Sequence, residues 1–387
     1  MSSLSHNISA QLPIERGISD ISKMASESLY PGAQVPKIIA VGSGKGGVGK
    51  TFFAANLGHQ LTVQNKSVVL IDTNFGSPSL HTYFNIHNPK YNLKELIINP
   101  KADINQLIFN TNLPNLKIIC GSPGTLGISE NTHIIASRII RSIKKLNADF
   151  VILDLGTGTN LSDIILFLQA DEGIIITNPE PTSIQEAFNF FKFCLLKKLE
   201  SIVNEQPKYL AQIDQAYDHF DDEIGKNLKS LIRSLNNGNH RLKLQFQNFQ
   251  PGFVLNMVYH ETELIEATAF QMAVEDIFGI KLKFWGNMNF YPEIKKSSLN
   301  DLYLEKYENL NTFYKNMARQ LITIHSQPQI ANKILSNRKN GVRTSRTVTY
   351  EQGELICSSK CSLWNNCTSQ RGGYPCKMKY IGFLKNL

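Results

Sequence analysis

The sequence predicts an α/β protein with a doubly wound, mostly parallel sheet, a helical insertion and a small C-terminal Cys-containing module. Seven short β-branched runs recur along the chain, helix-length segments separate most of them, and a glycine-rich loop follows the first run. Buried strands that alternate with helices are typical of a parallel sheet covered by helices on both faces. The ligand site of such a sheet lies at the carboxyl ends of its strands.

In chain order, a mostly polar segment, 1–35, precedes the first apolar run. The predicted strands cover 37–43, 67–73, 116–122, 150–156, 172–178, 252–258 and 280–287. Roughly seventy residues separate Thr182 from Pro251, where one crossover helix needs about fifteen to twenty. We therefore expect two extra amphipathic helices, forming an insertion at about 200–250 on the sheet edge. A last helix is predicted at roughly 300–326.

Composition places the chain among soluble globular proteins. Of its 387 residues, 42% are hydrophobic and six are cysteines, which excludes a disordered chain, collagen and a disulfide miniprotein. No run of eighteen apolar residues and no signal-type N-terminal core is present, so we expect a cytoplasmic protein.

Charge and pattern divide the chain into four parts: an N-terminal segment (1–35), an α/β domain (36–326), a basic linker (327–350) and a Cys-rich module with an amphipathic tail (351–387). Residues 319–387 hold eleven Lys and Arg against two acids, a net charge of +9, although the whole chain carries +8. A basic tail on a neutral body indicates either an anionic partner, such as nucleic acid or lipid, or a solvated linker.

The strongest motif is GSGKGGVGKT, which lies between the first strand and a predicted helix. It has P-loop spacing, in which glycines let backbone N–H groups surround phosphates, Lys50 neutralises phosphate oxygens and Thr51 offers a hydroxyl to Mg²⁺. We therefore predict a nucleotide and Mg²⁺ as ligands. The predicted nucleotide-binding residues of the loop are Gly44, Lys45, Gly46, Gly47, Val48, Gly49, Lys50, Thr51 and Phe52.

A second lysine in the loop, Lys45, makes KGGVGKT resemble the deviant P-loop of the MinD/ParA class of ATPases. This resemblance implies a P-loop ATPase in which ATP drives formation of a sandwich homodimer. It assigns Lys50 to the phosphates of its own subunit and Lys45 to those of the partner. An added cation beside a triphosphate offsets charge that a diphosphate lacks.

Further segments resemble the same class at matching order: VVLIDTN (68–74), FVILDLGTG (150–158), TNPEPTSIQEA (177–187), GFVLNMV (252–258) and FWGNMNFYPEIKKS (284–297). The third is very like FlhG, a MinD relative that controls flagellar number. The resemblance implies that Asp154 and Asp72 join Thr51 at Mg²⁺. It also implies that Asn256 reads adenine and that the loop containing Pro292 covers the base.

One departure from the class concerns catalysis. The second acid of the strand-two motif, which orients the attacking water, is Asn74 here. An amide can hold a water but cannot accept its proton, so we expect slow hydrolysis. The base-covering loop also departs, because Asn289 and Tyr291 stand where the class has Pro and Asp.

Four cysteines cluster near the C-terminus, namely Cys357, Cys361, Cys367 and Cys376. In a reducing compartment such a cluster indicates a metal before disulfides, and four thiolates suit either Zn²⁺ or a [4Fe–4S] cluster. Loose structural or redox thiols are the alternative. Asp154 has no cysteine shortly after it, which argues against a reductase of the nitrogenase iron protein type.

The sequence thus predicts a slow MinD/FlhG-like ATPase that positions or regulates a flagellum, a division site or other polar machinery. The protein partner is not predicted. The ending KMKYIGFLKNL resembles the MinD membrane-targeting tail, which implies contact with the inner face of the membrane; packing of its apolar residues on the cysteine module is the alternative. The alternatives are a binding platform with negligible hydrolysis, an iron–sulfur carrier ATPase and a DNA-bound partitioning ATPase.

Overall fold

In a computed structural model of the chain, the described residues are 35–99, 101–122, 132–203, 206–218, 220–237, 249–296 and 307–326. Their strands are β1 (Lys37–Gly42), β2 (Val68–Asp72), β3 (Ile108–Asn110), β4 (Leu116–Ile119), β5 (Phe150–Asp154), β6 (Glu172–Thr177), β7 (Gly252–Val258) and β8 (Lys283–Asn289). They form one sheet in the order β3-β4-β2-β5-β1-β6-β7-β8. The predicted doubly wound fold is confirmed, and all seven predicted strands are present.

The α-helices are α2 (Lys50–Val63), α3 (Lys94–Ile98), α4 (Thr132–Ile143), α5 (Leu161–Gln169), α6 (Pro181–Val203), α7 (Pro207–Asp218), α8 (Asp222–Asn237), α10 (Leu264–Phe278), α11 (Pro292–Lys296) and α12 (Glu308–Ser326). The described residues also form the 3₁₀ turns η1 (Leu80–Phe84), η2 (Ile104–Leu107) and η5 (Glu261–Glu263). None of the helices in these described ranges is long and apolar enough to cross a bilayer.

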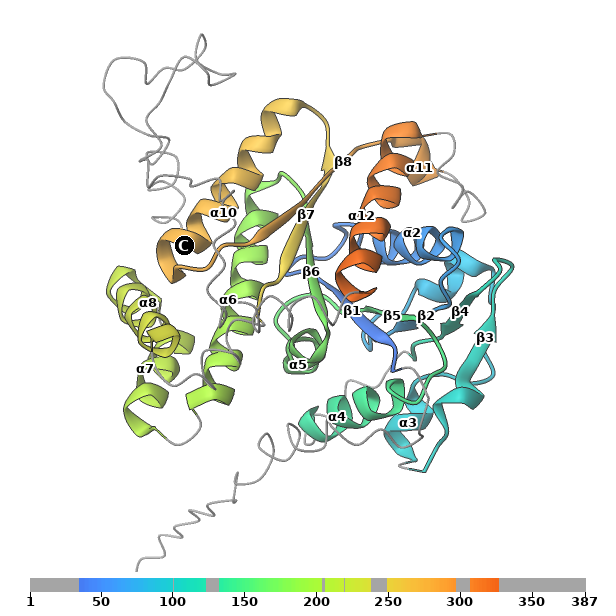
Figure 1. The fold of residues 1–387 in the computed structure, drawn as a ribbon, viewed down its shortest axis with the longest axis horizontal. Coiled ribbons are helices and arrows are strands. Elements are labelled where there is room, and N and C mark those ends of the chain that lie inside the picture. The colour runs from blue at the N-terminus through green and yellow to red at the C-terminus, as the bar shows by residue number, and fades with distance from the viewer. Residues whose placement is uncertain are drawn as a thin grey trace, which may run out of the picture.

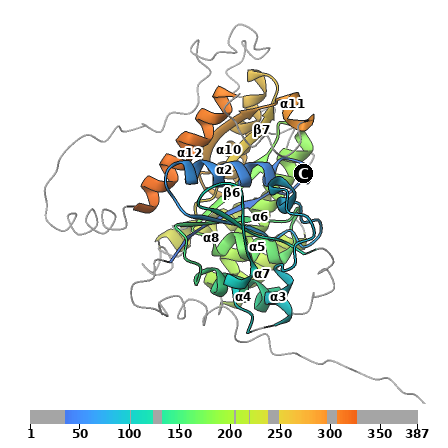
Figure 2. The same ribbon diagram turned by 90° about the vertical axis from the view of Figure 1, so that its right-hand side faces the viewer.

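Helices cover both faces of the sheet. Alternate residues of β1 point to opposite sides, so that Ile39 packs with α2 and α12 whereas Ile38 packs with the layer of α4, α5, α6 and α10. Figures 1 and 2 show α2 and α12 on one side of the strands and α4, α5 and α6 on the other. Burial on both faces explains why these strands read as continuous apolar runs.

Strand β3 was not predicted. It is three residues long and pairs antiparallel with β4 at the sheet edge, whereas every other pairing in the sheet is parallel. A run this short carries no readable alternation, so sequence periodicity cannot detect it.

The two predicted insertion helices are α7 and α8, but their place differs from the expected sheet edge. Helix α7 packs against α6, and α8 packs against α7 and α10, which adds an outer layer of helices (Figure 1). The cause is the apolar stripe of α8, whose Leu228, Leu231, Ile232 and Leu235 are buried in the core shared with α6 and α10.

Candidate functional site: the P-loop edge of the sheet

The P-loop joins the end of β1 to the start of α2. Gly47 and Gly49 have φ angles of 77° and 93°, a left-handed conformation that favours glycine. A Cβ atom on Gly44 would lie 1.9 Å from the carbonyl oxygen of Glu186 in α6, so only glycine fits there. The glycines therefore serve the curvature of the loop and its close packing on α6.

Lys50, the P-loop lysine, is buried at the first position of α2, with 7% of its surface exposed. Its Nζ donates to Oγ of Ser43 at 3.0 Å, and that hydroxyl donates to the carbonyl oxygen of Lys45 at 2.7 Å. Burial lowers the pKa of Lys50, although the charges of Asp154 and Asp163 act to raise it. Sequence reasoning missed Ser43, whose only signal is a hydroxyl residue directly between the strand and the first loop glycine.

Thr51 and Asp154 form the part of the site that fits a metal ion. Oγ1 of Thr51 donates to Oδ2 of Asp154 at 2.7 Å, while Oδ1 of Asp154 is buried with no hydrogen-bond partner. Burial, and then the charge of Asp72, raise the pKa of Asp154 to about 7. A hydroxyl beside an unsatisfied carboxylate oxygen is the hard oxygen donor set that Mg²⁺ prefers. These two residues fit the predicted magnesium site.

Asp72 lies at the end of β2 and is fully buried. Its carboxylate accepts backbone N–H groups of Asn74 at 3.0 Å, Ser79 at 2.9 Å and Leu80 at 3.0 Å. Burial raises its pKa to about 6, and these hydrogen bonds oppose the rise. The carboxylate thus organises the loop after β2, and its predicted place at Mg²⁺ stays a proposal.

Asn74 uses its side chain within its own turn. Its Oδ1 accepts from the backbone N–H groups of Gly76 at 3.3 Å and Ser77 at 3.2 Å, and its Nδ2 donates to the carbonyl oxygen of Ser77 at 2.9 Å. An aspartate could accept the same two bonds but could not make the third. Asn74 is therefore matched to this turn.

Lys45, the second P-loop lysine, lies at the surface. Its Nζ donates to Oε2 of Glu180 at 2.5 Å and to Oγ1 of Thr182 at 2.9 Å, and 35% of its side chain is exposed. Glu180 and Thr182 lie at the start of α6, which follows β6. Sequence reasoning did not assign these two partners, although they lie within the stretch 177–187 that carried the FlhG resemblance.

Asn256 lies near the end of β7 and supports the P-loop. Its Nδ2 donates to the carbonyl oxygen of Val48 at 2.7 Å, and its Oδ1 accepts the backbone N–H of Met257 at 2.8 Å. Both functional groups of the amide are thus used inside the protein. Phe52, in the first turn of α2, packs against the core that α2 shares with the sheet.

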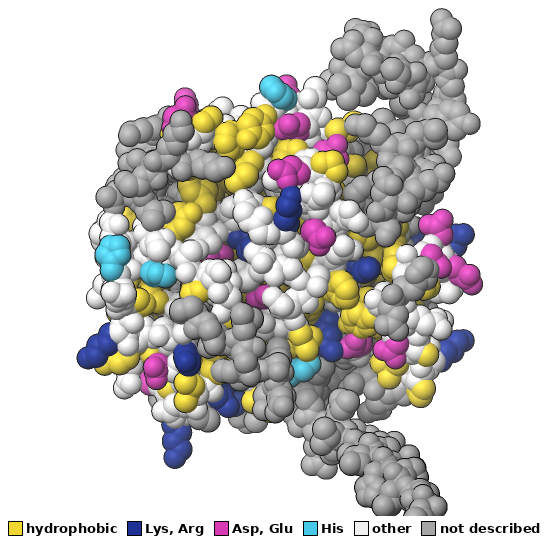
Figure 3. All heavy atoms as spheres, turned by 180° about the vertical axis from the view of Figure 1, so that it is seen from behind, with side chains coloured by type: hydrophobic (Ala, Val, Ile, Leu, Met, Phe, Trp, Pro, Cys, Tyr) yellow, Lys and Arg dark blue, Asp and Glu magenta, His cyan; other side chains and the backbone are white. Residues whose placement is uncertain are grey.

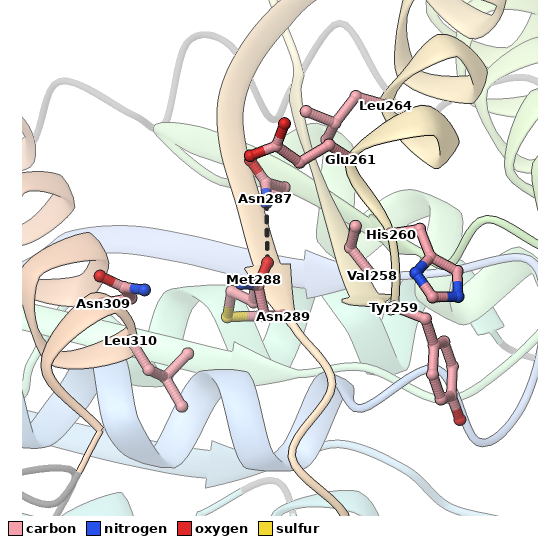
Figure 4. Close-up of a pocket in the computed structure, with 10 residues that line it drawn as sticks. All are labelled: Val258, Tyr259, His260, Glu261, Leu264, Asn287, Met288, Asn289, Asn309 and Leu310. Atoms are coloured by element: carbon pink, nitrogen blue, oxygen red, sulfur yellow. Dashed lines mark hydrogen bonds between the residues drawn. The ribbon is translucent and has the colours of Figure 1, made fainter.

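A cavity of about 340 Å³ opens at the carboxyl ends of β7 and β8 (Figure 4). It is lined by 258–261, Leu264, 287–289, Asn309 and Leu310. Two of these lining residues are joined by a hydrogen bond, in which the Asn287 amide donates to Oδ1 of Asn289 at 3.2 Å. In Figure 4 the side chains of Asn309 and Leu310 lie to one side of β8, and those of Tyr259 and His260 to the other. Pro292, at the start of α11, lies just beyond this lining.

The fold therefore gathers the P-loop, Asp72 and Asp154 at one edge, because β1, β2 and β5 are neighbours and end together.

The predicted cysteine cluster, the basic linker and the amphipathic tail lie outside the described residues. The other two cysteines, Cys120 and Cys194, are buried, and burial raises the pKa of the Cys120 thiol to about 12. Both are small apolar core residues, not nucleophiles.

Comparison with known families assigns the class of this fold and site. The ParA family, described as NUBPL iron-transfer P-loop NTPases, matches residues 34–232. Because the match takes in just over half of the chain, the protein belongs to the ParA family of P-loop NTPases. The predicted MinD/ParA class is confirmed.

Among curated proteins, the chain is similar to septum site-determining proteins MinD. It is 32% identical to that of Buchnera aphidicola over 152 residues, which are 39% of this chain and 56% of that protein. It is 29% identical to that of Synechocystis over 183 residues, 46% of this chain and 68% of that protein. The chain spans about half the length of the first curated relatives it matches.

Solved structures share the fold. The MinD of Pyrococcus horikoshii, in complex with Mg-ADP, has a TM-score of 0.51 at 18% identity and covers 75% of this chain and 97% of its own. The ATP complex of a Cyanothece McdA variant has a TM-score of 0.51 at 17% identity and covers 74% and 97%. At such identities the likeness concerns the fold alone.

Proposed function

We propose that the protein is a MinD-like switch, in which ATP binding favours a homodimer and the dimer engages a partner or surface that the monomer does not. The different settings of two lysines in one loop carry this proposal. Lys50 is buried among the carboxylates of its own site, whereas Lys45 lies at the surface on Glu180 and Thr182. Because Lys45 lies outside the phosphate-binding site of its own subunit, it is available to the phosphates of a second subunit.

Each part of the site has a role in this proposal. The P-loop N–H groups and Lys50 bind and orient the phosphates, and Thr51 with Asp154 would hold Mg²⁺. Bound Mg²⁺ would neutralise charge on the phosphate oxygens. The cavity at β7 and β8 has the size of a small-ligand pocket and is lined by asparagine amides, so we assign the nucleobase to this edge of the sheet. Asn256 acts by holding the P-loop at Val48.

The biological role follows from the relatives and is also a proposal. The matched curated proteins are named as septum site-determining proteins, and the stretch 177–187 resembles FlhG. We therefore place this chain among regulators of a division site, a flagellum or other polar machinery. On the face seen in Figure 3, the described Lys and Arg side chains are interspersed with Asp and Glu, which gives no support there for a DNA-binding surface.

The test is the oligomeric state of purified full-length protein by light scattering with ATP, ADP or no nucleotide. We expect a dimer with ATP only. Lys45→Ala should bind a fluorescent ATP analogue like the wild type yet stay monomeric, and the exposed Lys90→Ala should still dimerise. A Lys45→Ala protein that dimerises normally with ATP would refute the switch.

An iron–sulfur role is the second proposal, because the matched family is described by iron transfer and the chain carries Cys357, Cys361, Cys367 and Cys376. Protein purified without oxygen should then contain iron, and the four Cys→Ser substitutions should remove it. Zinc at about one ion per chain would instead make the module structural. Metal-free protein whose four thiols titrate freely would refute both forms of the module.

A further inference from the structure

The loop that follows Asp154 is fixed to the P-loop strand by backbone hydrogen bonds at both ends. The N–H of Leu155 donates to the carbonyl oxygen of Val41 at 3.0 Å, and that of Gly158 donates to Ser43 at 3.1 Å. Gly158 has a φ angle of 83°, so the loop turns sharply there. Any movement of this loop must therefore be coupled to the P-loop.

Between these two bonds, the N–H of Gly156 has a side-chain acceptor. It donates to Oδ1 of Asp163 at 3.2 Å, and Asp163 lies in the first turn of α5 with 3% of its surface exposed. A Cβ on Gly156 would lie 2.6 Å from Oδ2 of Asp163, so a glycine is needed for this contact. A buried carboxylate held against a backbone amide fixes the middle of the loop.

Asp163 also interacts with the charges of the site. Burial raises its pKa to about 6, while the hydrogen bond from Gly156 and the charge of Lys50 act to lower it. In return its charge acts to raise the pKa of Lys50. Asp163 therefore contacts the loop on one side and influences the phosphate-binding lysine on the other.

We infer that Asp163 is a positioning residue, which holds the loop 155–158 against the P-loop in the geometry that a γ-phosphate requires. This inference rests on the proposed ATP-binding function, because the position of the loop matters for binding only when a γ-phosphate is present. ADP, which lacks that phosphate, should depend little on the loop. Asp163 itself does not touch the nucleotide in this proposal.

The first test measures the loop without nucleotide, by hydrogen exchange of peptides that contain 155–158. In Asp163→Ala these amides should exchange about tenfold faster or more, because a hydrogen bond that opens rarely is lost. Asp163→Asn keeps an acceptor oxygen and should restore most of the protection. Ser162→Ala, on the same turn of α5, is the matched control and should exchange like the wild type.

The second test measures function in the same variants. Asp163→Ala should lower kcat, or the affinity for a non-hydrolysable ATP analogue, by about tenfold, with ADP affinity within about twofold of the wild type. Unchanged loop exchange in a folded Asp163→Ala protein would overturn the inference, as would equally faster exchange throughout the chain. A wild type that binds no nucleotide would instead refute the proposed function, while the exchange experiment still tests the loop.

Discussion

The P-loop edge and the outer helices α7 and α8 are built on opposite principles. The edge buries Lys50, Asp72 and Asp154, and burial raises the pKa of both carboxyl groups. Among the side chains of α8 that the structure describes, the apolar Leu228, Leu231, Ile232 and Leu235 are buried, and polar ones such as Arg233 are exposed. Buried charge disfavours the fold unless it is compensated, whereas buried apolar surface favours it. Substitutions should therefore change ligand binding at the edge and stability in the outer helices.

The largest effect should come from Lys50→Ala. The variant loses about two charge-assisted hydrogen bonds to phosphate, each contributing about 2 kcal/mol, so nucleotide affinity should fall by about a thousandfold. Titration with a fluorescent ATP analogue measures this, with Lys90→Ala as the control. An affinity within tenfold of the wild type would contradict the assignment of the P-loop.

The reverse pattern is expected for Leu231→Ala in α8. Leu231 is 3% exposed in the shared core, so truncating it should lower the free energy of unfolding by about 2–4 kcal/mol. Denaturant unfolding measures the loss, and the exposed Arg233→Ala is the control. Nucleotide affinity should stay at the wild-type value. If affinity falls with stability, the two regions are not independent.

The sequence predicts the fold best where strands are buried on both faces of the sheet. It predicts the site best where the backbone conformation requires a particular residue type. Strands such as β5 are continuous apolar runs, and the P-loop needs glycines at fixed spacing. Long-range partners carry no such signal. Glu180, which follows β6, meets Lys45 of the P-loop only because β1 and β6 are neighbours in the sheet. Likewise, the amphipathic pattern of α8 predicted a helix, but it did not predict that this helix packs on α7 and α10.

Asn74 offers a finer test of the P-loop edge. Asn74→Asp restores a charged group that can orient and deprotonate water, so ATP turnover should rise by several-fold to about tenfold without tighter ATP binding. The aspartate also loses the bond to the carbonyl of Ser77, so two hydrogen bonds instead of three hold its carboxylate in the turn. Steady-state phosphate release measures turnover, and Asn74→Ala should not show the gain. A wild type faster than Asn74→Asp would show that another residue positions the water.

The smallest effect concerns Glu172, a half-buried acid at the amino end of β6, away from the P-loop. Burial raises its pKa from the ordinary 4.5 to about 7, although the charge of Lys283 opposes the rise. The folded state therefore binds more protons than the unfolded state between these values, and stability is lost as pH rises through about 7.

Glu172→Gln removes that dependence while keeping the shape of the side chain. At pH 8 the variant should melt about 2 °C higher than the wild type or more, and at pH 5 the two should nearly agree. The exposed Glu275→Gln should show no such difference between the two pH values. Glu172 has no ligand role in our proposal, so the substitution should leave nucleotide affinity unchanged. Glu172 would then differ from the carboxylates of the P-loop edge, whose charge serves a ligand. A variant less stable at pH 8 would mean that attraction to Lys283 outweighs the burial of the carboxylate.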